Sequence, residues 1–395
     1  MEALFHDWIS FAVRIAHIVA AIGWIGSSFY FMWLDSSLRH DPDLPGGVKG
    51  ESWSVHGGGF YQVRKFAVAP EKMPKVLHWF KWESYSTWLT GFLMLAVTYW
   101  WGAEGLLIDR EVADIPVGLA ILISAGSLFA GWFLYDRLCK SPLKETPAAL
   151  FGVLYIGIMA LCWLYGHVFS ARAAWLHTGA MIATIMSGNV FMVIIPNQKK
   201  VVEVLKAGGE PDPVYGQIAK LRSTHNNYLT IPVLAMMVSN HYPLAFGHPL
   251  NWAMVGFVLA IGGIVRHFFN SHDQGKHGWA IRWQWPLASF LFIGMMWLSS
   301  WRPDQLQADL EPHRAMAIVA THCAACHAAA PTHEFYEEAP AGVIFDGLGD
   351  IRAHSSKMLA QAVMSNIMPL GNETGMTAEE RAVLGAWLRA GAPAD

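Results

Sequence analysis

Charged side chains are scarce in this sequence, and their scarcity excludes an ordinary soluble protein. Of the 395 residues, 14% are Asp, Glu, Lys or Arg, whereas an average soluble domain contains about 25%. The sequence also lacks any run of Lys and Arg, and its formal net charge is −3. Binding to nucleic acid normally needs concentrated positive charge, so we expect no nucleic-acid partner.

The hydrophobic residues divide the chain into two parts. They make up 54% of the sequence, and 18 of the 19 tryptophans lie at or before Trp301. The last 90 or so residues contain short polar loops, Ala-rich segments and a cysteine cluster instead. We therefore expect a membrane domain over residues 1–302 and a soluble domain over residues 311–395.

Eight apolar stretches have about the length that a helix needs to cross a bilayer, roughly 20 residues. They are residues 8–34, 82–101, 116–138, 148–169, 173–195, 219–240, 251–269 and 283–301. The stretch 219–240 is the weakest, because it begins with polar residues and contains Pro232. Trp and Tyr stand at the ends of many stretches, where the membrane interface favours them. The pattern predicts a polytopic bundle of eight transmembrane helices.

Loop charge supports the weak stretch and orients the chain. With eight spans, the loops that face away from the termini hold eighteen Lys and Arg residues. The loops on the side of the termini hold three, Arg110, Arg172 and Arg302. Because cations concentrate in cytoplasmic loops, we expect both termini and the soluble domain outside the cytoplasm. Omitting 219–240 would place ten of those cations on the wrong face.

The clearest chemical motif is Cys323-Ala-Ala-Cys326-His327. This spacing attaches haem covalently through two thioethers, and the adjacent His presents its imidazole to the iron. A zinc half-site and a redox-active cysteine pair are the alternatives, but a second Cys/His pair for zinc is missing. Cys139 and Cys162 lie in or beside apolar stretches, and we expect them to be buried thiols.

A sixth ligand for the iron is expected from Met368. It follows His327 by 41 residues and stands in a Met-Pro loop just before the last predicted helix, which resembles class I cytochromes c. A thioether ligand raises the reduction potential, as suits an acceptor of electrons. That last helix should begin after Thr377, which opens a capping box. The other methionines that compete are Met358, Met364 and Met376.

Ionisable residues inside the apolar stretches are costly and are therefore functional candidates. The outer half carries Arg14, His17, His167 and His177, and the three histidines can lie near one level. They can hold a second, non-covalent haem b, with His17 as one ligand and His177 or His167 as the other. The alternative is hydrogen-bonded structural histidines beside a snorkelling Arg14.

A second polar group belongs to the cytoplasmic side. His56 precedes Gly57, Gly58 and Gly59, and such glycines let a backbone approach a planar ligand and point N–H donors at it. The other members of the group are His78, Lys81, Glu83, Asn226, Asn227 and His267. The group predicts a site for a small, flat, hydrogen-bonding anion, and a polar interface with a glycine hairpin is the alternative.

Together these motifs resemble the membrane-bound urate oxidase (urate hydroxylase) family of bacteria. The resemblance covers essentially the whole chain and implies an all-α fold, an eight-helix transmembrane domain followed by a class I-like cytochrome c domain. Arg14-Ile-Ala-His17 is also similar to the first helix of membrane protoporphyrinogen oxidases, whose His is linked to haem binding. The motifs are His56-Gly-Gly-Gly-Phe-Tyr, Leu77-His-Trp-Phe-Lys-Trp-Glu83, Thr224-His-Asn-Asn-Tyr-Leu-Thr-Ile-Pro232, Ser239-Asn-His-Tyr-Pro243 and the C-terminal C-x-x-C-H.

The resemblance implies oxidation of urate to 5-hydroxyisourate at the bacterial inner membrane, with the cytochrome domain in the periplasm. Water supplies the oxygen, and the candidate bases are His56, His78 and Glu83. Two electrons leave through one covalent haem c to a soluble cytochrome c or a respiratory oxidase. The expected substrate-binding residues are Gly57, Gly58, Gly59, Lys81, Asn226, Asn227 and His267.

The sequence leaves one geometric difficulty and two other functions open. A substrate near the cytoplasmic face would lie about 30 Å from the outside, too far for one fast electron transfer. Either a haem in the membrane relays the electrons or the substrate binds nearer the outer half. The other functions are an electron-transfer subunit that oxidises quinol or a partner dehydrogenase, and a transporter with a regulatory cytochrome.

Overall fold

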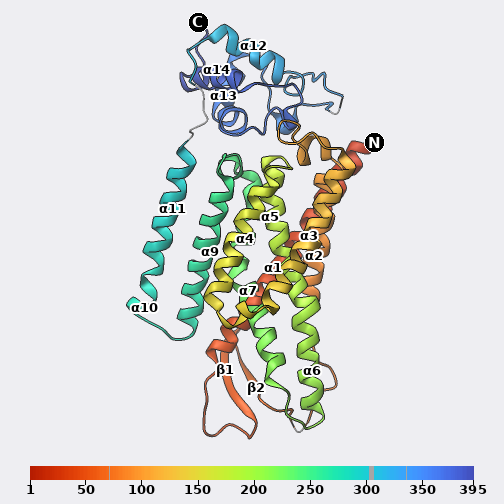
Figure 1. Ribbon diagram of the computed structural model, residues 1–395, viewed down its shortest axis with the longest axis vertical. Coiled ribbons are helices and arrows are strands. Elements are labelled where there is room, and N and C mark those ends of the chain that lie inside the picture. The colour runs from red at the N-terminus through yellow and green to blue at the C-terminus, as the bar shows by residue number, and fades with distance from the viewer. Residues whose placement is uncertain (71, 302–306, 335) are drawn as a thin grey trace.

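The computed structural model describes residues 1–70, 72–301, 307–334 and 336–395. The chain is mostly helical, with 68% helix and 5% strand. Long helices lie side by side in one bundle, a smaller helical domain covers one end of it, and a hairpin projects from the other end (Figure 1). Figure 1 therefore shows a helical bundle and a separate, smaller helical domain at one end of it.

All eight predicted apolar stretches are helical. The long helices are α1 (Glu2–Ser37), α2 (Trp82–Leu95), α3 (Val117–Lys140), α4 (Pro147–Tyr165), α5 (Ala171–Gly188), α7 (Pro213–Val238), α9 (Asn251–Asp273) and α11 (Gln284–Ser300). The bundle also contains η1 (Ala96–Trp100), η2 (Ala103–Leu107), η3 (Pro142–Glu145), η4 (Asn189–Ile194), α6 (Ile195–Lys206), η5 (Ser239–His241), α8 (Pro243–Phe246) and α10 (Trp279–Arg282). Helix α7 continues through Pro232, so the weakest stretch forms a helix despite its proline.

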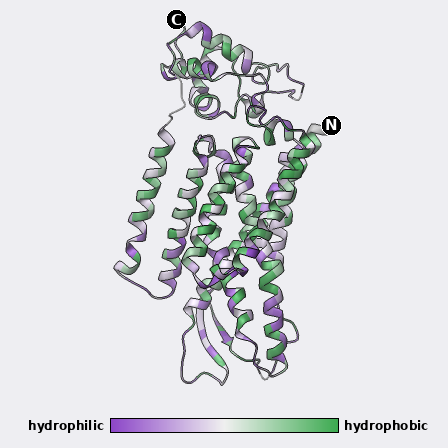
Figure 2. Cartoon of the chain, in the orientation of Figure 1, coloured by the Kyte–Doolittle hydropathy of each residue, from purple (hydrophilic) through white to green (hydrophobic). Residues whose placement is uncertain are grey.

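The bundle has the surface of a membrane protein. Within the described residues, five helices are long and apolar enough to cross a membrane, namely Leu4–Ser37, Val117–Lys140, Pro147–Tyr165, Ala171–Lys206 and Asn251–Asp273. Large apolar side chains such as Trp8, Ile22, Phe290 and Trp297 are exposed on α1 and α11, and Figure 2 shows the apolar residues along the bundle helices. Apolar surface of this extent is compatible with contact to lipid. The count of eight spans stays a prediction.

The all-α expectation is wrong at the first long loop. Strands β1 (Val48–His56) and β2 (Gly59–Phe66) pair antiparallel, with His56 opposite Gly59. Gly57 and Gly58 form the turn, and their φ angles are +58° and +79°. A two-residue hairpin turn with two positive φ angles favours glycine at both positions. The glycine run therefore builds a hairpin turn.

The C-terminal domain packs around its first and last helices. It contains α12 (Pro312–His322), η6 (Pro340–Gly342), α13 (Leu348–Met358), η7 (Leu359–Val363), η8 (Leu370–Asn372) and α14 (Ala378–Arg389). Ile318 of α12 shares a buried core with Leu384 and Trp387 of α14. Thr377 caps α14 in the predicted capping box with Glu380, which confirms where this helix starts. The predicted boundary at residue 302 lies outside the described residues.

Candidate functional site

A large cavity of about 1750 Å³ runs through the bundle between α1, α2, α5 and α7. We call its two ends the hairpin end, lined by Lys49, Lys65 and His78, and the capped end, lined by Arg14, Tyr99, Arg172, Asn240 and His241. The capped end lies beside the C-terminal domain, because Arg172 also lines a small cavity together with Ile367 and Leu370 of that domain. Cavities for small ligands usually measure about 300–1,000 Å³, so this one has room for a small molecule and water along its length.

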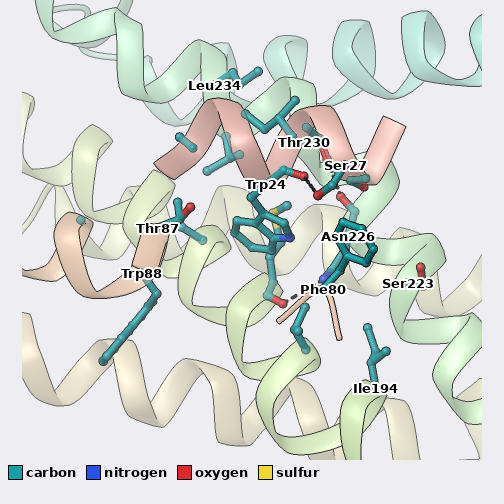
Figure 3. Close-up of a pocket in the computed structure, with 18 of the residues that line it drawn as sticks. Trp24, Ser27, Phe80, Thr87, Trp88, Ile194, Ser223, Asn226, Thr230 and Leu234 are labelled. Carbon is teal, nitrogen blue, oxygen red and sulfur yellow. Dashed lines mark hydrogen bonds between the residues drawn. The ribbon is translucent and has the colours of Figure 1, made fainter. Parts of the chain in front are cut away.

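The middle of the cavity offers few unused polar groups. Asn226 points into it near Trp24 (Figure 3), but its Nδ2 donates to Met186 O at 2.8 Å and its Oδ1 accepts from Asn189 Nδ2 at 3.0 Å. The hydroxyl of Thr230 donates to the carbonyl of Asn226 at 2.8 Å. Because these groups are already paired within the protein, the middle suits passage of a ligand better than tight polar binding.

Two of the three predicted catalytic residues lie together. His78 lines the hairpin end, and its Nε2 is 3.7 Å from Glu83 Oε1. The other carboxylate oxygen of Glu83 is buried without a hydrogen-bond partner among the described residues. His56 is exposed on the hairpin and does not line the cavity. The structure therefore brings His78 and Glu83 together and leaves His56 apart.

The predicted substrate-binding glycines lie away from the cavity. Gly57, Gly58 and Gly59 belong to the hairpin turn and its edge, and a Cβ built on Gly57 or Gly58 meets no atom within 4 Å. Lys81 lies over the Trp82 ring at 5.7 Å and does not line the cavity either. The turn geometry that needs glycine here explains the glycine run without a ligand.

Of the remaining predicted substrate residues, only Asn226 lines the cavity. Asn227 accepts from Asn270 Nδ2 at 2.8 Å, and His267 pairs with the Tyr228 hydroxyl at 2.7 Å. Consecutive helical residues point in directions about 100° apart, so Asn227 faces α9 when Asn226 faces the cavity. The structure does not assemble the predicted substrate group.

The three predicted membrane-haem histidines have different surroundings. His17 lines the cavity, and its Nδ1 lies 3.1 Å from Thr87 O. His177 is fully buried and uses both ring nitrogens, with Ser124 Oγ at 2.6 Å and Ala173 O at 2.8 Å. His167 is exposed, and its Nδ1 donates to Trp163 O at 2.8 Å. Of these histidines, only His17 lines the large cavity, because α5 turns His177 toward α3, and haem binding by this group stays a prediction.

From the sequence, Arg14 was named as an ionisable residue of the outer half, whereas Tyr99 and Arg172 of the capped end were not named as site residues. The Tyr99 hydroxyl donates to Asn240 Oδ1 at 3.2 Å, and both Arg172 and Arg14 lie within electrostatic range of Tyr99. The Arg172 guanidinium lies 5.6 Å from the Phe246 ring, and its buried Nε has no hydrogen-bond partner among the described residues. Arg172 was counted as a loop cation. The loops on the side of the termini hold only three Lys and Arg residues, and Arg172 is one of them. This rarity was the signal that could have singled it out.

A buried ion pair was missed as well. Arg222 Nη2 lies 2.7 Å from Asp136 Oδ1, and both side chains are almost fully buried. Lys140 Nζ lies 2.6 Å from the other oxygen of Asp136. Arg222 was counted among the loop cations, but it joins α7 to α3 inside the bundle. Neither Arg222 nor Asp136 lines the cavity, so we assign the pair to the packing of the two helices.

The C-terminal motif has the geometry that covalent haem attachment needs. Cys323 and Cys326 are free thiols, and the backbone N–H of His327 donates to Cys323 O at 2.9 Å, which makes the motif one helical turn. His327 Nδ1 donates to Val343 O at 2.9 Å. This bond fixes the ring and leaves Nε2 available as a ligand.

A structural zinc site would need further ligands beside the two thiols. Burial raises the pKa of Cys323 to about 11, and burial followed by the charge of Glu373 raises the pKa of Cys326. Within the described residues, no group of three or more His, Cys, Asp or Glu side chains is placed to hold a metal ion.

Met368 is held by a buried arginine. Arg381 Nη1 donates to Met368 O at 2.6 Å and to Ala362 O at 2.7 Å. Burial lowers the pKa of Arg381. Met358 and Met376 are buried in the core of the domain, whereas Met368 is half-buried at its edge. An imidazole nitrogen, a thioether sulfur and two thiols are the donor set of a c-type haem, so these residues fit that group.

The loop that carries Met368 docks on the helix bundle. Ile367 is buried in one core with Phe246 and Met254 of the bundle, and Asn372 Nδ2 donates to Glu111 Oε1 at 2.6 Å. A small cavity of about 40 Å³ lies at this contact, lined from one side by Ile367 and from the other by Arg172. Arg172 lines the large cavity too. The capped end therefore lies next to the Met368 loop.

Comparison with known proteins identifies the bundle. No curated protein and no solved structure matches the chain. Residues 3–299 match the sequence profile of a family described as urate oxidase N-terminal. The match includes all the helices around the large cavity and ends before the C-terminal domain, and it supports an oxidoreductase acting on urate. Since it extends over more than half of the sequence, the chain belongs to the urate oxidase N-terminal family.

Proposed function

We infer that the protein oxidises urate to 5-hydroxyisourate in the bacterial inner membrane and passes the electrons out through a covalent c-type haem. The observation that carries this proposal is the position of the cavity. It lies wholly within the part that matches the urate oxidase family and ends beside the Met368 loop of the domain with the C-x-x-C-H motif. A substrate site and an electron exit are thereby neighbours in one chain.

Four residues would hold the haem. Cys323 and Cys326 would form the thioethers, and His327 and Met368 would bind the iron. When bound, the haem supplies a one-electron acceptor whose potential the thioether ligand raises. Because urate gives up two electrons, each turnover needs two successive transfers, and a soluble cytochrome c or a respiratory oxidase must then take the electrons onward.

The hairpin end provides the charge that an anionic substrate needs. Lys49 and His78 line it, and Lys65 lines it in an ion pair with Asp35 at 2.6 Å. Positive charge at the mouth of a cavity raises the local concentration of an anion. If loop charge orients the chain as expected, this mouth opens toward the cytoplasm and the cytochrome domain lies in the periplasm. We therefore assign His78, with Glu83 beside it, to substrate binding or proton transfer at this end.

Turnover of urate by the purified protein tests the function. Under air, urate should reduce added soluble cytochrome c with two equivalents per urate, because each cytochrome takes one electron. Oxygen consumption and peroxide should stay close to background. Stoichiometric peroxide would show that urate passes its electrons straight to oxygen. Failure of urate to reduce the protein at all would favour the electron-transfer subunit instead.

The pair at the hairpin end gives a second test. His78→Ala and Glu83→Gln should each lower urate turnover, because His78 lines the end of the cavity through which the substrate enters and Glu83 lies beside it. The covalent haem spectrum should stay intact, because both residues lie at the opposite end of the bundle from Cys323. His56→Ala is the matched control, since this exposed histidine does not line the cavity. Losses below about twofold in both variants would remove the pair from the site.

A further inference from the structure

The capped end of the cavity concentrates positive charge without a carboxylate partner. Arg14 and Arg172 both line it, and neither forms an ion pair with an Asp or Glu among the described residues. The buried Nε of Arg172 is also without a hydrogen-bond partner among them. A guanidinium inside an apolar bundle is costly unless something pairs with it. Arg14 is exposed on α1, so the partly buried Arg172, with its unpartnered Nε, is the residue that indicates an anion as the missing partner.

The neighbouring side chains suit a flat anion that carries carbonyl groups. Tyr99 donates its hydroxyl to Asn240 Oδ1, which leaves the amide N–H donors of Asn240 outside that bond. Guanidinium and amide donors can pair with the carbonyl oxygens of a purine anion, and guanidinium does so with planar geometry. His241 lines the same end and offers an imidazole that can accept a proton.

The capped end also lies beside the loop that carries Met368. Arg172 and Leu106 line both the large cavity and the small one at the domain contact. Ile367 and Leu370, on either side of Met368 in sequence, line the small cavity from the cytochrome side. A ligand bound to Arg172 would therefore be separated from the Met368 loop by little more than the arginine itself. No relay through a second haem is needed for this arrangement.

Resting on the proposed function, we propose that Arg172 and Arg14 form the subsite that holds the purine anion while it is oxidised. The hairpin end then serves as the mouth, and the middle serves as the passage. In the reaction, one C–O bond forms from water at C5 of urate, two protons are released, and two electrons leave. The haem that Cys323, Cys326, His327 and Met368 would hold would supply a one-electron acceptor, so each urate would need two successive transfers, and a respiratory acceptor would have to take each electron onward.

Arg172→Gln tests the subsite. A hydrogen bond to a charged group contributes enough that its loss should raise the KM for urate by about 10- to 100-fold. Arg172→Lys keeps the charge and should recover part of the loss. Arg110→Gln is the matched control, because Arg110 is on the same side of the bundle but is exposed and paired with Asp114 at 3.0 Å. Haem content and reduction by dithionite report whether each variant is folded.

Binding without turnover separates the two proposals. Radiolabelled urate is dialysed to equilibrium against dithionite-reduced protein, which cannot accept electrons. Weaker binding by Arg172→Gln, with Arg110→Gln unchanged, supports the subsite. If the wild type binds urate through Arg172 but never reduces cytochrome c, the subsite stands and the proposed function fails. If Arg172→Gln keeps both its KM and its affinity for urate, the subsite is wrong and the proposed function stands.

Discussion

Replacing Cys323 and Cys326 with alanine should abolish urate-dependent reduction of cytochrome c completely. The double variant cannot form thioethers, so no haem should stay attached to the chain after denaturation. Because the proposed function sends both electrons out through this haem, its loss should remove their exit. Peroxidase staining after denaturing electrophoresis measures the attached haem, and absorbance of added cytochrome c measures turnover.

The other two cysteines provide the matched control for this experiment. Cys139 and Cys162 are buried in α3 and α4 as free thiols, which agrees with the expectation from sequence. A Cys139→Ala, Cys162→Ala variant removes the same number of thiols from the bundle and should keep its attached haem. Covalent haem in the Cys323→Ala, Cys326→Ala variant would overturn the assignment of the motif.

The features that sequence predicted correctly depend on local information. The eight helical ranges follow from the length of the apolar stretches, and the start of α14 follows from the capping box at Thr377. The hairpin at Gly57 and Gly58 was named only as the alternative to a ligand-binding loop, although its signal is local too. Two glycines between two runs of strand-forming residues are a hairpin signal, and the expectation of a ligand-binding loop took precedence over it.

The features that sequence missed depend on which face of a helix meets which neighbour. Asn226 and Asn227 are adjacent and chemically identical, yet only Asn226 lines the cavity. His177 was expected to bind haem, but Ser124 of α3 occupies its Nε2. Arg172 lies directly before the apolar stretch 173–195, so the sequence suggests a loop cation. In the structure, α5 places it against Phe246. Such assignments need the packing of distant segments.

The last prediction concerns Gly247, at the contact between the bundle and the C-terminal domain. This glycine follows α8, directly beneath the loop that carries Met368. A Cβ built on it would overlap the Ser365 side chain and lie 3.0 Å from Ser365 Cα. Ser365 is buried, and its hydroxyl donates to Ala360 O at 2.7 Å. Any larger side chain at Gly247 must therefore push this loop away from the bundle.

Gly247→Leu should slow electron transfer from urate to the haem while leaving the large cavity and the Cys323 motif intact. Misplacement of reacting groups by about 1 Å can cost about 10²-fold in rate, and we expect a loss of that order in the rate at which urate reduces the haem under anaerobic stopped flow. Urate affinity and reduction by dithionite should be unchanged, because the large cavity and the Cys323 motif are not altered. Gly118→Leu is the matched control, since a Cβ at that glycine of α3 meets no atom within 4 Å. An unchanged rate in Gly247→Leu would mean that electrons leave the bundle elsewhere than at the Met368 loop.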